Sequence, residues 1–438
     1  MSFVRCWLVL VGLCALLTPL ASAQTARWWK GNLHTHSFWS DGDDFPEMIA
    51  AWYKTNGYHF LALSDHNVLL AGEKWISVTN ADREKVLERY VDTFGRAWVT
   101  QRSIFRGRRQ VRLKTLEEFR PRLEEKDRFL MVPSEEISAE FQKLPIHVNA
   151  SNVRELVNPP KGTNVYDVIQ RTIDAVLAQR QRTGQPMIAH INHPNFGWAL
   201  TAEDILRVRG EHFFEVYNGH PSVRNEGDDV HASVDRMWDI ILAFRLSRLG
   251  LGPMYGLAVD DSHHYHVYST NKANPGRGWI VVRAGNLTAP SLIAAMENGD
   301  FYASSGVVLR DVQRSSRGLR LEIEPEPGVT YVTTFIGTLR GFDPTRKRGP
   351  AMEKGAKGNP MLTGIYGEEI GAVLGRSEGP SATYEFAGDE LYVRAKVVSS
   401  KLKANSYRGD ELEVAWVQPS VLESNVLWSA RQTAKNGK

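Results

Sequence analysis

Between residues 28 and 305 the sequence alternates short β-like apolar runs with longer amphipathic stretches. The apolar runs predict strands at 31–34, 59–63, 129–133, 187–191, 213–217 and 255–259, and the stretches between them predict helices at 45–56, 115–126, 165–182 and 233–249. Thr115, with Glu118 three residues later, predicts a capping box at the start of one helix. This alternation favours an α/β fold with a mostly parallel sheet, and the number of repeats favours a closed barrel.

The histidines divide the chain into two parts. All thirteen lie between His34 and His266. Beyond about Val307 the runs 319–323, 330–335 and 391–398 read as β-strands, and no long amphipathic helix follows. The stretch after residue 73 is too long for a βα loop. We therefore expect a barrel at 28–306 with a helical insertion at about 73–128, and a small C-terminal β-sandwich as accessory domain at 307–428.

Residues 1–23 have the pattern of a secretory signal peptide. Arg5 supplies a positive charge, an apolar run follows at 7–17, and Ala21-Ser22-Ala23 matches a small-residue cleavage site. The apolar run is too short to span the ~30 Å hydrocarbon core of a membrane. We therefore expect an exported protein, periplasmic or secreted, with no stable membrane anchor.

Cleavage after Ala23 removes Cys6 and Cys14, the only cysteines of the chain. The ligands of a metal site in the mature protein are then confined to His, Asp and Glu. The formal net charge of +3 is close to neutral, so nothing favours nucleic acid as a partner. The expected partner is a small-molecule substrate, and the sequence leaves the oligomeric state open.

His34-Thr35-His36 stands at the end of the first predicted strand. Side chains two residues apart in an extended segment project to the same side, so both imidazoles can bind one cation. Asp41 follows in a turn-like segment, where it either returns to the site or forms an Asx-turn.

Four later predicted strands also end in ionisable residues. They carry Asp65-His66, Glu135-Glu136 with His147 further on, His190 and His193, and Asp260-Asp261 with His263. In an α/β barrel the carboxyl ends of the strands meet at one face. Five such ends in succession predict a metal site with more than one ion.

The order HxHxxxSDG, S-D-H-N, E-E-I-S, H, H-P and D-x-H resembles the PHP superfamily, named for the polymerase and histidinol phosphatase proteins that carry it. The resemblance extends over about residues 28–305. It implies a distorted seven-stranded (β/α) barrel that holds two or three divalent ions, and imidazole and carboxylate ligands suit Zn, Mn and Fe alike.

The resemblance also implies a ligand set. One ion takes His34, His36, Glu136 and Asp261; a second takes His66 and His263, with Asp41 as a further candidate; a third takes His147 and His193, with Glu136 bridging.

Three of these assignments have competitors. Glu136 is preferred to Glu135 because it directly precedes Ile137-Ser138. His193 is preferred to its neighbour at 190 because a proline follows it. Asp261 is preferred to the preceding aspartate because it has the D-x-H spacing.

Further segments resemble the exported carbaryl-hydrolase-like branch of the superfamily, which cleaves carbamate esters. They are Gly278-Trp279, the run 299–304, Tyr392-Val393-Arg394 and Ala415-Trp416.

Two cations that share a carboxylate lower the pKa of a bound water from 15.7 to about 7. We therefore expect a metal-dependent hydrolase with a metal-bridging hydroxide, most simply a phosphoesterase. The alternatives are a carbamate, carboxylic-ester or amide hydrolase, and a non-catalytic, metal-stabilised binding protein.

Residues beside the expected ligands are candidates for the remaining roles. Asp65, His264 and His266 are placed to protonate a leaving group. Arg277 is a candidate clamp for an anionic substrate. Glu215, in the strand at 213–217, is expected to orient metal ligands.

Overall fold

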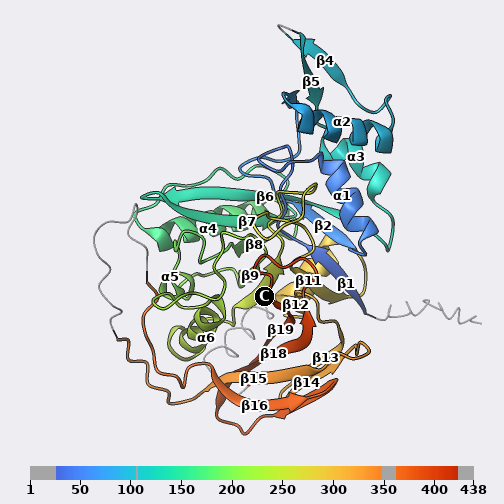
Figure 1. Ribbon diagram of the computed structural model, residues 1–438. Coiled ribbons are helices and arrows are strands. Elements are labelled where there is room, and N and C mark those ends of the chain that lie inside the picture. Colours follow the sequence, from blue (N-terminus) through green and yellow to red (C-terminus); the bar gives the residue numbers. More distant parts are fainter. Residues whose placement is uncertain (1–25, 105–106, 348–361, 423–438) are drawn as a thin grey trace, which may run out of the picture.

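The computed structural model describes residues 26–104, 107–347 and 362–422 (Figure 1). The expected signal peptide, residues 1–23, lies outside these ranges. The described helices are α1 (Pro46–Thr55), α2 (Ala81–Phe94), α3 (Leu116–Leu123), α4 (Val165–Thr183), α5 (Ala202–Ile205), α6 (Val234–Phe244) with the π-helical turn η2 (Arg245–Leu249), and α7 (Ala289–Glu297). Among the described residues, no helix combines the length and apolar character needed to cross a membrane.

Within the described ranges, one mixed sheet of thirteen strands runs through the molecule. In spatial order its strands are β10 (Tyr255–Val259), β9 (Phe213–Asn218), β8 (Ile188–Ile191), β7 (Leu144–Ser151), β6 (Leu130–Phe141), β2 (Phe60–Leu63), β1 (Arg27–Asn32), β11 (Trp279–Ala284), β12 (Phe301–Ser304), β19 (Leu412–Ser420), β18 (Glu390–Leu402), β15 (Tyr331–Leu339) and β16 (Ala372–Glu378). Pairing is parallel within β1–β2–β6 and within β8–β9–β10. The protein therefore has the expected α/β class, but its sheet is mixed and not mostly parallel as predicted.

The strand β7 is antiparallel to both of its neighbours and was missed by the sequence analysis. The prediction ended the preceding strand at residue 133. In the structure β6 continues to Phe141 and turns back through Gln142 and Lys143, whose φ angles are 50° and 68°. The two left-handed residues form the tight hairpin turn that returns the chain along β7.

Beyond their carboxyl ends, β10 and β1 come together. Thr35 and Ser262 form a parallel bridge, and the backbone N–H of His36 donates to the carbonyl of Ser262 across 2.9 Å. The sheet therefore curves until the segments that follow β10 and β1 meet. This curvature directs the segments that follow β1 and β10 toward one point.

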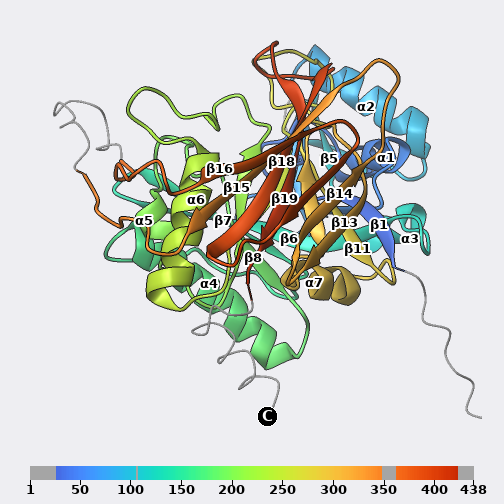
Figure 2. The same ribbon diagram turned by 90° about the horizontal axis from the view of Figure 1, so that it is seen from below.

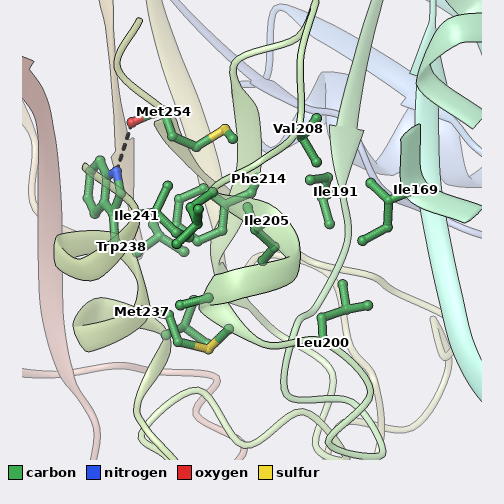
Figure 3. Packing of buried hydrophobic residues seen from close by; sticks show 14 of the residues in the cluster. Ile169, Ile191, Leu200, Ile205, Val208, Phe214, Met237, Trp238, Ile241 and Met254 are labelled. Carbon is green, nitrogen blue, oxygen red and sulfur yellow. Dashed lines mark hydrogen bonds between the residues drawn. The ribbon is translucent and has the colours of Figure 1, made fainter. Parts of the chain in front are cut away.

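Apolar side chains of α4 and α6 pack against β8 and β9 (Figure 3). Ile169 on α4 and Ile241 on α6 lie in the same buried cluster as Phe214. Trp238 is fully buried there, and its indole N–H donates to the carbonyl of Met254 across 2.8 Å. Its polar atom is therefore satisfied, so burial of the large ring is favourable.

The insertion at about 73–128 is not entirely helical. Besides α2 and α3 it contains a three-stranded antiparallel sheet of β3 (Trp75–Val78), β5 (Arg108–Arg112) and β4 (Gln101–Ile104). These elements extend from one end of the molecule (Figure 1). The β5 sequence is mostly charged and buries Val111 alone. A strand with so few apolar residues has little hydrophobic periodicity, which explains the wrong prediction.

The C-terminal strands do not form a separate sheet system. β19 pairs with β12, so the large sheet continues into β18, β15 and β16. A second sheet of β13 (Leu309–Ser315), β14 (Gly318–Ile323) and β17 (Ser381–Glu385) packs beside it (Figure 2). Leu321 of this sheet shares a buried apolar cluster with Phe335 and Val397 of the large sheet.

Candidate metal centre

Histidine and acidic side chains converge beyond the carboxyl ends of neighbouring strands. His34 and His36 follow β1, His66 follows β2, Glu136 lies in β6, His147 lies in β7, His193 follows β8, and Asp261 and His263 follow β10. The curvature of the sheet brings distant positions together, so that His36 Nε2 and Asp261 Oδ1 lie 3.2 Å apart. All residues of the implied ligand set, Asp41 included, meet at this place.

Among the described residues, five overlapping groups have ligand atoms within 4.8 Å of one another. They are His36, Asp41, His66 and His263; His34, His193 and Asp261; His34, His36 and Glu136; His66, Glu136 and His147; and His34, His190 and Glu215. These groups differ in two ways from the ligand set that the family resemblance implies. His36 also lies with Asp41, His66 and His263, and His193 also lies with Asp261. Neighbouring cations that have ligands in common would produce such overlap.

Three buried atoms at the centre have no hydrogen-bond partner among the described residues: His34 Nε2, His36 Nε2 and Glu136 Oε2. His34 Nε2 lies 3.4 Å from Glu136 Oε1 and 3.3 Å from Asp261 Oδ1. A buried polar atom without a partner is costly. A divalent cation bound between these nitrogen and oxygen atoms removes that cost, so the residues present fit a metal site.

The two central carboxylates are held in the charged form. Burial by itself raises the pKa of Glu136, but the imidazoles of His147, His34 and His66 hold it well below its ordinary value. The pKa of Asp261 is likewise lowered against the effect of burial, chiefly by His34. Both groups are therefore ionised at neutral pH, as metal ligands must be.

Glu215 orients two of the candidate ligands through hydrogen bonds. Its carboxylate accepts a hydrogen bond from His34 Nδ1 across 2.6 Å and from the backbone N–H of His193 across 2.7 Å. The side-chain amide of Asn218 donates to Glu215 across 2.9 Å and to Asp261 across 3.1 Å. A carboxylate that accepts from Nδ1 leaves Nε2 of the imidazole free to bind a cation.

Two of the candidate ligands have unusual backbone conformations. His193 has a φ of 21° and Asp261 a φ of 49°. Positive φ is uncommon for residues other than glycine and carries a strain energy. Such strain concentrates at functional sites, where the surrounding structure holds it.

Glu135, Asp260 and His190 were the alternatives to the preferred ligands, and each forms hydrogen bonds of its own. Glu135 projects from the opposite face of β6 to Glu136 and accepts a hydrogen bond from the backbone of Val157 across 2.7 Å. Asp260 accepts from the hydroxyl of Tyr53 and from the backbone of Gly276 and its two successors. His190 is fully buried, and its Nε2 lies 3.2 Å from Glu215.

Asp65 does not line the pocket, which corrects its expected role as a proton donor. It is fully buried and accepts hydrogen bonds from the backbone and hydroxyl of Ser37 and from the hydroxyl of Ser40. These bonds hold the loop between His36 and Asp41. Asp65 is therefore a positioning residue.

Arg277 is also placed differently from the prediction. It is 1% exposed, and its guanidinium donates to the carbonyls of Asn405, Gly219, Lys272 and Ser269. Because its donors are occupied by loop backbone, it is not the expected clamp for a substrate.

His266 lies outside the metal pocket. Its Nδ1 accepts from Arg89, and its Nε2 donates to the carbonyl of Asp43 across 2.9 Å. It lines a neighbouring cavity between α2 and the segment after β10. The leaving group of a substrate in the metal pocket is therefore not within its direct reach.

A cavity of about 310 Å³ lies beside the converging residues. Its lining comprises Asp41, His66, Glu136, His147, His193, Phe196, His220, Asp261, His263 and His264. Of the expected proton donors, only His264 faces this cavity. His220 and Phe196 were missed by the sequence analysis, because neither belongs to a strand-end motif with ligand spacing. The one available signal for His220 was its position two residues after Asn218.

Two solved structures are similar to the chain. One is a two-domain protein from Bacteroides vulgatus, described as containing a predicted PHP-like metal-dependent phosphoesterase; identity is 13%, the TM-score is 0.37, and the match covers 90% of this chain and 95% of that one. The other, from Bifidobacterium adolescentis, is described as a "putative metal-dependent phosphoesterase"; identity is 12%, the TM-score is 0.27, and the match covers 53% of this chain and 87% of that one. No family model and no curated protein matches the chain.

Proposed function

We propose that the protein is an exported, divalent-metal-dependent hydrolase of the PHP type that acts on phosphoesters. The observation that carries the proposal is the set of buried, unpartnered ligand atoms of His34, His36 and Glu136 beside a cavity open to solvent. A structural metal site is closed by protein ligands, whereas a catalytic site keeps room for substrate. The half-exposed Asp41, whose side chain is 54% accessible, leaves such room at the mouth.

In this proposal the protein has two parts, a distorted seven-stranded barrel and a C-terminal sandwich. The barrel is formed by β10, β9, β8, β7, β6, β2 and β1. The bridge between Thr35 and Ser262 supports the closure of this barrel. The shared apolar cluster between the β13–β14–β17 sheet and the large sheet supports the sandwich. Export rests on the sequence of residues 1–23, and amino-terminal sequencing of protein from the periplasm or the medium tests it.

In the proposed site, two or three Zn, Mn or Fe ions are held by the converging imidazoles and carboxylates. These are His34, His36, Asp41, His66, Glu136, His147, His193, Asp261 and His263. When bound, divalent ions in such a site supply hydroxide at neutral pH and stabilise the negative charge that develops on the substrate. Glu215 and Asn218 fix the orientation of His34 and Asp261, so the ligand geometry is set before substrate arrives.

A second candidate function is the hydrolysis of carbamates or carboxylic esters. No lysine or arginine stands among the described residues that line the metal cavity. Sites for dianionic phosphate commonly contain arginine or lysine, and Arg277 is engaged elsewhere. This lining favours substrates of low negative charge, such as phosphodiesters, carbamates and esters, over phosphomonoesters.

The test is a hydrolysis panel with the purified mature protein after loading with Zn²⁺, Mn²⁺ or Fe²⁺. Metal content is measured by elemental analysis before each assay. We expect turnover of bis(4-nitrophenyl) phosphate to exceed that of 4-nitrophenyl phosphate, while 4-nitrophenyl acetate and an aryl N-methylcarbamate report the second candidate. Metal-loaded protein that is inactive on the whole panel would contradict both functions.

A further inference from the structure

Two histidines on the wall of the metal cavity stand outside every group of candidate ligands. The rings of His220 and His264 lie beside His263, with centroid separations of 5.5 Å and 6.4 Å. Both residues line the cavity. Neither belongs to a group of described residues whose ligand atoms approach within 4.8 Å. Their presence in the cavity therefore needs an explanation other than metal binding.

In two of the candidate ligands, His34 and His263, the hydrogen bond at Nδ1 differs from that in His220 and His264. In His34, Nδ1 faces the carboxylate of Glu215 at 2.6 Å, and in His263 it faces the carbonyl of Asp261 at 2.9 Å. Both partners are acceptors, so Nδ1 carries the proton. Nε2 then presents a lone pair, which is the form of imidazole that binds a cation.

His220 and His264 have the opposite arrangement. The backbone N–H of Ser222 donates to Nδ1 of His220 across 3.1 Å, and that of Ala273 donates to Nδ1 of His264 across 3.2 Å. A nitrogen that accepts a hydrogen bond carries no proton, so the neutral ring carries its proton on Nε2. Each ring therefore carries an N–H donor at Nε2. Both rings line the metal cavity, and His264 also lines the neighbouring cavity beside α2.

The backbone around both rings is also held in place. The side chain of Asn218 accepts a hydrogen bond from the backbone N–H of His220 across 2.8 Å. The backbone N–H of His264 donates to Ala273, and its carbonyl accepts from the side chain of Asn274 across 2.7 Å. Donors fixed in this way are preorganised, and they lose little entropy when a substrate binds.

We infer that His220 and His264 bind substrate through Nε2–H, each donating a hydrogen bond to a phosphoryl or acyl oxygen, and do not ligate metal. The inference rests on the proposed function and deepens it, because it names the groups that recognise the substrate's oxygens. It also accounts for a cavity without lysine or arginine in its lining. Neutral donors suit an oxygen that gains charge as the bond is attacked.

The first test reads the ring tautomers without any activity assay. Histidine ¹⁵N spectra of the zinc-loaded protein are recorded for the wild type and for His220→Gln and His264→Gln, whose missing signals assign the rings. We expect a protonated, metal-free Nε2 in both residues and an unchanged zinc content in both variants. A zinc-bound or unprotonated Nε2, or a loss of zinc in either variant, would overturn the inference.

The second test measures anion binding. Calorimetry with inorganic phosphate and with acetate is carried out on zinc-loaded wild type, His220→Phe, His264→Phe and the two Gln variants. Loss of one neutral hydrogen bond should weaken binding about three- to tenfold in the Phe variants. Glutamine, which keeps an N–H donor, should restore part of the affinity. Phe variants that bind both anions as tightly as the wild type would contradict the inference.

His59 provides a matched control. Its Nδ1 also accepts a backbone N–H, that of Lys30, across 3.0 Å. It precedes β2 at the amino end of that strand, away from the metal cavity, so His59→Gln should bind phosphate like the wild type. The hydrolysis panel separates the two hypotheses: normal anion binding and tautomers with no turnover would contradict the proposed function alone.

Discussion

Glu215 and His34 are joined by a hydrogen bond of 2.6 Å between carboxylate and Nδ1, although 181 positions separate them in the chain. Both side chains are fully enclosed. Because burial excludes water, no solvent molecule replaces the carboxylate if it is lost. The pair therefore determines which nitrogen of His34 is available to a metal ion.

Replacement of Glu215 by glutamine should weaken metal binding about 10- to 100-fold, as expected for a residue that orients a ligand. Titration with zinc against a competing chelator measures the change. Glu155→Gln is the control, because Glu155 pairs with Arg182 on the surface, where both side chains are 58% exposed. Equal zinc affinities in the two variants would show that Glu215 does not orient the site.

Glu136→Gln should abolish most hydrolytic activity and reduce the bound metal. The change removes the negative charge that His34, His66 and His147 surround. The neighbouring Glu135→Gln should keep activity within a few-fold, since that side chain faces away from the cavity. Steady-state kinetics with elemental analysis compares the two variants, and the reverse order of effects would reassign the ligand.

Stability should depend on pH through Glu211, far from the metal cavity. Burial raises the pKa of this carboxyl to about 8 in the folded protein, while its ordinary value is about 4.3. The unfolded chain therefore binds fewer protons than the folded protein between these values. The resulting contribution to stability is present at low pH and is lost as pH rises from about 4 to about 8.

For one proton the slope reaches at most ~1.4 kcal/mol per pH unit. Glu211→Gln should remove this slope and be more stable than the wild type at pH 8. Urea unfolding of both proteins from pH 5 to pH 8 measures the difference. Parallel curves over that range would show that Glu211 ionises normally in the folded protein.

The C-terminal strands should be coupled to the rest of the molecule by a buried ion pair. Arg394 on β18 donates two hydrogen bonds of 2.8 Å to the carboxylate of Asp239 on α6, and Tyr392 donates a third across 2.9 Å. Asp239→Ala removes both of these hydrogen bonds from the buried guanidinium, which stays paired with Asp235 at 3.2 Å. Loss of this part of the buried ion pair should cost up to about 3–5 kcal/mol of unfolding free energy.

The double variant Asp239→Leu with Arg394→Met removes both charges and should be destabilised less than Asp239→Ala. Chemical denaturation measures all three proteins. If the single and double variants lose equal stability, the incompletely paired guanidinium of Arg394 is not the source of the loss.

Local features were readily predicted from the sequence. The capping box of Thr115 and Glu118 is present as expected, because both of its hydrogen bonds lie within four residues of chain. The choice of Glu136 over Glu135 agrees with the face that each occupies, since neighbouring side chains of a strand point in opposite directions. Strand ends rich in histidine and carboxylate likewise indicated where the cavity would form.

Long-range contacts were not predictable in this way. The burial of Arg277 depends on carbonyls up to 128 positions away, and nothing in its local sequence distinguishes it from an exposed loop arginine. The turn at Gln142 and Lys143 and the polar strand β5 also lacked a periodic signal. The Asn405 partner of Arg277 comes from another part of the chain, whereas the turn joins two successive strands through residues that carry no glycine signal.

The sequence by itself determined the chemistry of this protein: which side chains are available as ligands, and that they stand at strand ends. Only the tertiary structure decided which role each of these side chains can have. In the proposed roles of His34, His220 and His264, the partner of Nδ1 decides whether Nε2 is free to bind a metal ion or carries a proton. For His34 that partner, Glu215, arrives through the folding of the sheet.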